Sequence, residues 1–87
     1  MDKMSCQERI IEIVETLKRY QLEGLRNKEL AKELALNEAM ICRDLTILEK
    51  RGWIERSIET GRWRLSMKFA RLGEKTADFY RKMEVDA

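Results

Sequence analysis

The sequence contains no histidine and no proline, and only two cysteines and four glycines among its 87 residues. Without histidine the chain cannot form zinc sites that mix Cys and His, and it cannot use His-based acid–base catalysis. Cys6 and Cys42 are too few for a disulfide framework and lack a metal-binding spacing, so we interpret each as an isolated thiol. The scarcity of proline and glycine disfavours a β-sandwich or a disordered tail.

Long apolar runs are also missing. No run reaches membrane-spanning length, and the N-terminus lacks the apolar segment of a signal peptide, which predicts a cytoplasmic protein. The sequence has no Gly-rich phosphate loop, nucleophile elbow or ligand cluster, so we expect neither an enzyme nor a cofactor. The length predicts one domain over residues 1–87, with residues 1–4 frayed.

Charge is abundant and unevenly distributed. Charged residues make up 39% of the chain and hydrophobic residues 44%, a balance typical of a strongly amphipathic, helix-rich domain. The net charge is only +2, but residues 43–68 hold seven basic and four acidic side chains, whereas residues 1–42 hold seven and eight. A local positive excess favours contact with nucleic acid, although the signal is weak when taken alone.

The first helical pattern follows Ser5-Cys6-Gln7-Glu8, in which Ser5 and Glu8 have the spacing of a capping box. The helix that it opens is predicted to end near Gln21. Leu25, in the connector that follows, is expected to be buried and to form a very short strand. The apolar stripe of this helix consists of Ile10, Ile13, Val14, Leu17 and Tyr20.

Two closely spaced helical patterns come next. The first covers residues 27–34 with Asn27 as its expected N-cap, and the second starts after Asn37, a second good cap. The second pattern runs from Glu38 to Lys50 or Arg51 and stops at Gly52, because glycine takes the left-handed C-terminal conformation without steric cost. Two helices joined by so short a turn predict a helix-turn-helix unit.

The longer of these two helices has two distinct faces. Ile41, Leu45 and Leu48 share one face, which we expect to be buried. The opposite face is expected to be free of large apolar residues and to carry Ala39, Arg43, Thr46 and Lys50. Such a face suits a helix that lies in a major groove. An ordinary solvated face remains the alternative, and Glu38 near the helix start counts against DNA because it would repel phosphate.

A β-hairpin is predicted after Gly52, with strands over residues 53–57 and 62–66 and a turn at Ile58-Glu59-Thr60-Gly61. Alternation places Trp63 and Leu65 on one face and Arg62 and Arg64 on the other. A two-stranded ribbon after a recognition helix is a wing, whose arginines could contact a phosphate backbone or enter a minor groove. The alternative is a solvated edge that charge protects from aggregation.

A last helix is predicted from Met67 to about Val85, with Ser66 as its cap, and residues 67–87 could serve as a dimerisation element. Its apolar stripe is too large to remain exposed on a small domain. We expect part of it to fold back on the first helix and the distal part to pair two subunits. The stripe consists of Phe69, Leu72, Phe79, Tyr80 and Met83.

Two family resemblances appear over roughly residues 8–72. The residues Arg43-Asp44-Leu45, Leu48-Glu49, Gly52, Ile54 and Arg56 resemble the DNA-binding region of the DeoR-type bacterial repressors. The segment at residues 61–66, passing directly into a helix, is similar to the N-terminal domain of IclR-type regulators, and Glu29-Leu30-Ala31 suits either family.

Both resemblances imply a mainly α winged helix-turn-helix fold: a three-helix core, a two-stranded wing and a C-terminal helix. They also imply that Arg43 approaches DNA and that the wing arginines contact its backbone. The chain departs from the DeoR-type pattern at Glu38, Met40 and Cys42. Both families carry an effector-binding domain beyond this region, and because the chain ends at Ala87 we expect no small-molecule effector.

The sequence therefore predicts a sequence-specific regulator of transcription that binds double-stranded DNA. A homodimer joined through the C-terminal helix would place two recognition helices roughly 34 Å apart on a palindromic site. The alternative is a winged-helix module that binds another protein. The predicted DNA-binding residues are Lys28, Asn37, Ala39, Arg43, Thr46, Lys50, Arg62 and Arg64.

Overall fold

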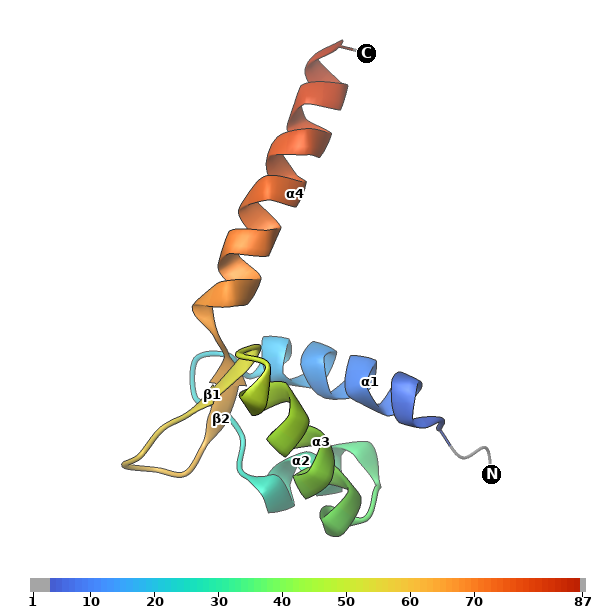
Figure 1. Cartoon of the computed structure of the whole chain (residues 1–87), viewed down its shortest axis with the longest axis vertical. Coiled ribbons are helices and arrows are strands. Elements are labelled where there is room, and N and C mark those ends of the chain that lie inside the picture. Colours follow the sequence, from blue (N-terminus) through green and yellow to red (C-terminus); the bar gives the residue numbers. More distant parts are fainter. Residues whose placement is uncertain (1–3, 87) are drawn as a thin grey trace.

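The computed structural model describes residues 4–86, which form four helices and one antiparallel hairpin (Figure 1). The predicted winged helix-turn-helix fold is confirmed, with three helices and the hairpin in one body. The expected fraying of residues 1–4 falls outside the described residues except for Met4. The elements are α1 (Cys6–Arg19), α2 (Asn27–Leu34), α3 (Glu38–Lys50), β1 (Ile54–Arg56), β2 (Trp63–Leu65) and α4 (Met67–Asp86).

Helix α1 begins with the predicted capping box. The Ser5 hydroxyl accepts a hydrogen bond from the Glu8 amide, and the Glu8 carboxylate accepts one from the Ser5 amide, each at 3.1 Å. These bonds satisfy two backbone donors that the first turn of a helix would otherwise leave free. The helix ends at Arg19, two residues before the predicted end.

Helices α2 and α3 form the predicted helix-turn-helix unit. The Asn37 side chain caps α3 by accepting a hydrogen bond from the Ala39 amide at 2.7 Å. The predicted N-cap role of Asn27 is wrong, because Asn27 is the first helical residue of α2 and Arg26 is the cap. The Arg26 amide instead donates to the Glu29 carboxylate at 2.8 Å. The Asn27 side chain contacts Trp63 and Cys42.

The hairpin packs over the three helices and pairs Ile54 with Leu65 and Arg56 with Trp63. Leu25 is buried as predicted and bridges Trp63 on the other side of β2. A Cβ at Gly24 would lie 2.9 Å from the Trp63 carbonyl oxygen, so only glycine permits this approach. The buried core consists of Ile13, Leu17, Leu25, Leu30, Ala31, Ile41, Leu45, Leu48, Ile54 and Trp63.

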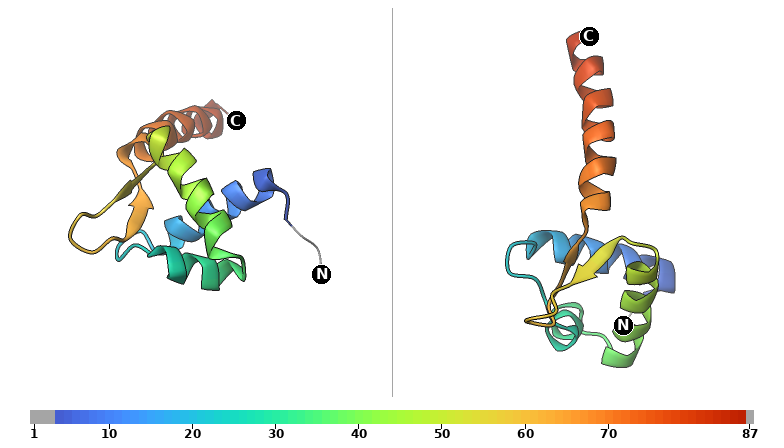
Figure 2. Two further views of the ribbon diagram at one scale, coloured as in Figure 1. Left: turned by 60° about the horizontal axis from the view of Figure 1, so that its bottom comes forward. Right: turned by 60° about the vertical axis from the view of Figure 1, so that its left-hand side comes forward.

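Helix α4 projects away from the body, as Figures 1 and 2 show from three directions. The expectation that part of it folds back on α1 is wrong. Only its first turn returns to the body, where Phe69 packs on Trp53 with ring centroids 4.8 Å apart. The side chains of the predicted stripe beyond this turn are exposed, and Phe79 retains 58% of its accessible surface.

A short set of contacts joins the end of α3 to the start of α4, and we call it the α3–α4 joint. The Ser66 amide donates to the Trp53 carbonyl at 2.9 Å, and the Ser66 hydroxyl donates to the Gly52 carbonyl at 2.6 Å. The Lys68 ammonium donates to the Arg51 carbonyl at 2.9 Å and lies 4.2 Å from the centroid of the Trp53 ring. Four polar and aromatic contacts therefore fix the direction in which α4 leaves the body.

Candidate nucleic-acid interface

The exposed face of α3 carries the residues that periodicity placed there. Ala39, Arg43, Thr46 and Lys50 are exposed, whereas the opposite face is buried as predicted. Within the described residues neither Arg43 nor Lys50 forms an ion pair, so both cations are available to an external anion. The Thr46 hydroxyl donates to the Cys42 carbonyl at 2.8 Å and keeps its acceptor capacity.

The same face also carries two large apolar side chains. Met40 retains 38% and Ile47 retains 56% of its accessible surface, and both lie beside Arg43 on the helical wheel. The expectation of a face without large apolar residues is therefore wrong. The signal was in the sequence, because at about 100° per residue positions 40 and 47 fall well outside the buried stripe.

A cleft opens between the start of α2 and the turn of the wing. Lys28, one of the predicted DNA-binding residues, lies in the first turn of α2 and is exposed. The positive end of the helix dipole adds to the potential there. Three cations and one carboxylate line this cleft, whose residues are Arg26, Asn27, Lys28, Glu38, Arg56, Thr60 and Gly61.

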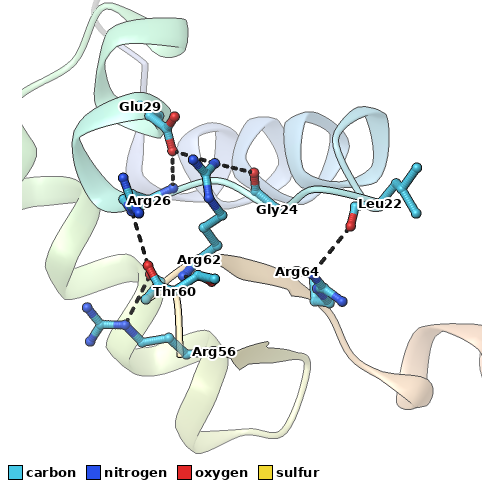
Figure 3. A network of polar contacts seen from close by, with 9 residues as sticks. Leu22, Gly24, Arg26, Glu29, Arg56, Thr60, Arg62 and Arg64 are labelled. Atoms are coloured by element: carbon cyan, nitrogen blue, oxygen red, sulfur yellow. Dashed lines mark hydrogen bonds and ion pairs between the residues drawn. The ribbon is translucent and has the colours of Figure 1, made fainter. Parts of the chain in front are cut away.

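The two predicted wing arginines do not point outward. The Arg62 guanidinium donates to the Glu29 carboxylate at 3.0 Å and to the Gly24 carbonyl at 3.2 Å, and Arg64 donates to the Leu22 carbonyl at 3.3 Å (Figure 3). The cause is the connector between α1 and α2, which runs beside β2 and offers these acceptors. The expectation that these arginines lie free on the outer side of the wing is therefore wrong.

Arg56, which belongs to the DeoR-type resemblance but not to the predicted DNA-binding residues, is the wing cation that borders the cleft. Its guanidinium carbon lies 5.3 Å from the centroid of the Trp63 ring, and its Nε donates to the Gly61 carbonyl at 3.3 Å. The side chain therefore lies along the cleft, on the face of the hairpin opposite to that of Arg64. The strand pairing contained the signal, because Arg56 lies opposite Trp63 in the register.

Asn27 connects β2 to α3. Its side-chain oxygen accepts a hydrogen bond from the Trp63 indole at 2.6 Å, and its side-chain nitrogen donates to the Cys42 sulfur at 2.9 Å. A single carboxamide thus contacts β2 and α3 at once. The distance between the wing and the exposed face of α3 is held by this bridge together with the core beneath it.

A buried ion pair connects α3 to α1. The carboxylate of Asp44, which directly follows Arg43 in the chain, receives hydrogen bonds from the Arg9 guanidinium. The Asp44 carboxylate raises the pKa of the Arg9 guanidinium further above its ordinary value, mainly through this hydrogen bonding. Sequence reasoning missed the pair because its members are far apart in the chain.

Residues 4–86 contain no group of three or more side chains arranged to hold a metal ion. No helix among these residues combines the length and apolar composition needed to cross a membrane.

Comparison with known proteins places this fold in a family. The chain matches a crystal structure of an IclR family transcriptional regulator from Brucella abortus with a TM-score of 0.65 at 21% sequence identity. The match covers 87% of this chain and 30% of the regulator, and it agrees with the IclR-type resemblance at the level of the fold. No curated protein sequence matches the chain. Because the family model for MarR matches residues 12–61, more than half of the sequence, the chain belongs to the MarR family of winged helix-turn-helix DNA-binding domains.

Proposed function

We propose that this chain is a sequence-specific regulator of transcription that binds double-stranded DNA with α3 in the major groove. The observation that carries the proposal is the exposed face of α3, where Arg43 and Lys50 have no acidic partner among the described residues. The cleft lined by Lys28 and Arg56 extends the positive surface toward the wing. The family and the matched regulator from Brucella abortus support the same role.

The proposed contacts divide into base and phosphate contacts. Base edges would meet the exposed face of α3 from its N-cap through its middle turns, where the helix lies in the groove. Phosphates would meet the cations at the rim of the surface. Arg62 and Arg64 could reach a phosphate only by breaking their present contacts, so the proposal assigns the wing contact to Arg56. The base-contacting set is Asn37, Ala39, Arg43 and Thr46, and the phosphate set is Lys28, Lys50 and Arg56.

The test is selection of binding sites from a random pool of double-stranded DNA, repeated at low and high salt. We expect an enriched sequence and an affinity that falls steeply with salt, because Lys and Arg release counterions from the phosphates. Arg43→Ala should lose the sequence preference and keep the melting temperature. Arg71→Ala, an exposed change on α4, is the matched control. Unchanged selection by Arg43→Ala would contradict the role of this residue.

We also propose that the distal part of α4 pairs two copies of the chain. Leu72, Phe79 and Met83 recur at helical spacing, and each is about half exposed in the single chain. An apolar stripe of this kind on a projecting helix favours association with a second apolar surface. A closed dimer is the common outcome for one self-complementary patch, and it predicts a palindromic operator.

Light scattering on the purified chain tests this pairing. Phe79→Glu should shift the mass from dimer to monomer without changing the circular dichroism of the body. Glu74→Lys, on the opposite face of α4, is a matched change of charge and should leave the mass unchanged. A wild-type chain that is monomeric at high concentration would refute the pairing.

A protein-binding module is the second candidate function. The exposure of Met40 and Ile47 favours it, because apolar side chains on a solvent face often contact other proteins. Salt separates the two functions, since an apolar protein contact loses little affinity when salt rises. Absence of both enrichment and salt-sensitive DNA binding would favour this candidate.

A further inference from the structure

Three side chains form one line along the exposed face of α3, and we call it the α3 stripe: Met40, Arg43 and Ile47. They are spaced three and four residues apart, so they lie one above another on the helix. Met40 and Ile47 are apolar and substantially exposed, and Arg43 between them is an exposed cation. The three side chains together present an apolar–cation–apolar surface on the exposed face of α3.

The chemistry of the stripe matches the major-groove edges of particular bases. Arginine pairs with the O6 and N7 atoms of guanine, whereas apolar side chains contact the C5-methyl group of thymine. That methyl is the apolar group that the four bases present in the major groove. Met40 and Ile47 therefore have a specific complement in DNA.

The distance along α3 between Met40 and Ile47 also fits the spacing of base pairs in DNA. Seven residues of α-helix rise about 10.5 Å, and successive base pairs lie about 3.4 Å apart. Met40 and Ile47 are thus separated by about three base-pair steps, with Arg43 between them. A helix lying along the groove would bring both apolar side chains to base edges on either side of the base that Arg43 contacts.

Neighbouring charge favours DNA over a protein partner for this stripe. The acidic residue nearest to Arg43 in the chain is Asp44, whose carboxylate is buried and paired with Arg9. Glu38 and Glu49 lie toward the wing, where they line clefts that also contain Arg56. The stripe therefore presents its cation without a competing exposed carboxylate, as contact with a polyanion requires.

We propose that Met40 and Ile47 are specificity-determining residues that contact thymine methyl groups on both sides of a guanine bound by Arg43. The inference rests on the proposed DNA-binding function and adds a base preference to it. Each half-site then contains a guanine with thymines, on either strand, within about two base-pair steps of it.

Replacing thymine by deoxyuridine in the selected site tests the proposal. Deoxyuridine keeps every hydrogen-bonding group of thymine and lacks only the methyl group. We expect affinity to fall roughly fourfold for each contacted methyl that is removed. In Met40→Ala one of these losses should disappear, and in Ile47→Ala the other should disappear, which forms a double-mutant cycle between side chain and methyl group.

Leu22→Ala is the matched control, because Leu22 is an apolar side chain that retains 89% of its accessible surface outside the α3 stripe. This variant should keep in full both losses of affinity that deoxyuridine causes. Thermal melting of all three variants should match that of the wild type, since each truncated side chain is exposed, and any change in affinity then belongs to the contact.

Four outcomes would overturn the inference. A selected site without thymine near the central guanine, or equal affinity for thymine and uracil at every position, refutes the methyl contacts and leaves the DNA-binding function standing. If deoxyuridine lowers the affinity of both alanine variants as much as that of the wild type, residues other than Met40 and Ile47 contact the methyl groups. Absence of any enriched sequence refutes the proposed function together with this inference and leaves the stripe to a protein partner.

Discussion

Arg9 of α1 and Asp44 of α3 form a buried ion pair in which one guanidinium holds both oxygens of one carboxylate. Arg9 Nη2 lies 3.0 Å from one carboxylate oxygen, and Nε donates to the other. The side chains retain 11% and 5% of their accessible surface. The pair neutralises the acidic residue next to Arg43 and fixes the rotation of α3, so that Arg43 faces outward.

Asp44→Ala is expected to lower the free energy of unfolding by about 3–5 kcal/mol, because it leaves a buried guanidinium without its partner. Urea denaturation measures the loss. Asp78→Ala removes the exposed pair between Asp78 and Arg81 and should cost less than about 1 kcal/mol. The double variant Arg9→Met with Asp44→Leu should recover most of the loss. Similar small losses for both single variants would contradict the structural role of the pair.

Thr16→Val is expected to stabilise the chain by about 1 kcal/mol. The Thr16 side chain is fully buried, and its hydroxyl has no hydrogen-bond partner among the described residues. Valine has nearly the same shape and removes the desolvated hydroxyl. Thr76→Val on α4 is the control, since that hydroxyl is exposed and donates to the Leu72 carbonyl. A lower melting temperature for Thr16→Val would show that the hydroxyl has a partner in solution.

Substitutions in the wing should separate phosphate contacts from structural contacts. Arg56→Ala is expected to weaken specific and non-specific binding alike and to reduce the slope of log affinity against log salt by about one. Arg62→Ala should lower the melting temperature, because Glu29 and the Gly24 carbonyl lose their partner, and should leave the slope unchanged. If Arg62→Ala reduced the salt slope and Arg56→Ala did not, Arg62 would instead be the phosphate-binding residue of the wing.

The Glu29 carboxylate predicts a dependence of stability on pH. Its pKa is lowered below the ordinary value of 4.5, first by the hydrogen bond from the Arg26 amide and also by the Arg62 charge. A pKa that is lower in the folded state contributes stability at pH values above 4.5, and this stability is lost as pH falls through the folded pKa. The melting temperature should therefore fall as pH drops below about 4.5.

Glu29→Gln should reduce this acid-dependent loss of stability, because its side chain does not titrate. Glu74→Gln, an exposed change on α4, is the control and should retain the full dependence. Melting curves recorded from neutral pH down to pH values below 4.5 provide the comparison. A Glu29→Gln curve that parallels the wild type would assign the acid sensitivity to other carboxylates.

Local signals predicted most of the elements correctly. The Ser5 capping box, the Asn37 cap and the stop at Gly52 each depend on residues within a few positions of one another, so the sequence determines them directly. The buried face of α3 follows from its 3.6-residue period in the same way. These signals were sufficient for the winged helix-turn-helix fold.

The remaining features depend on residues far apart in the chain. Alternation along the strand placed Arg62 on the expected face but could not predict the acceptors that the α1–α2 connector brings to it. The same limit applies to Asn27, whose side chain binds Trp63 rather than capping its own helix. The direction of α4 depends on the joint at its first turn, while its apolar stripe alone allowed either packing on α1 or projection.

The α3–α4 joint has a mechanical consequence. Because Ser66 and Lys68 bind carbonyl groups at the end of α3, helices α3 and α4 meet at a fixed angle. In a dimer paired along α4, this angle would set the separation and relative tilt of the two α3 helices. Operator spacing would then depend on the α3–α4 joint, whose residues lie outside the exposed face of α3, and could change independently of the bases that α3 contacts.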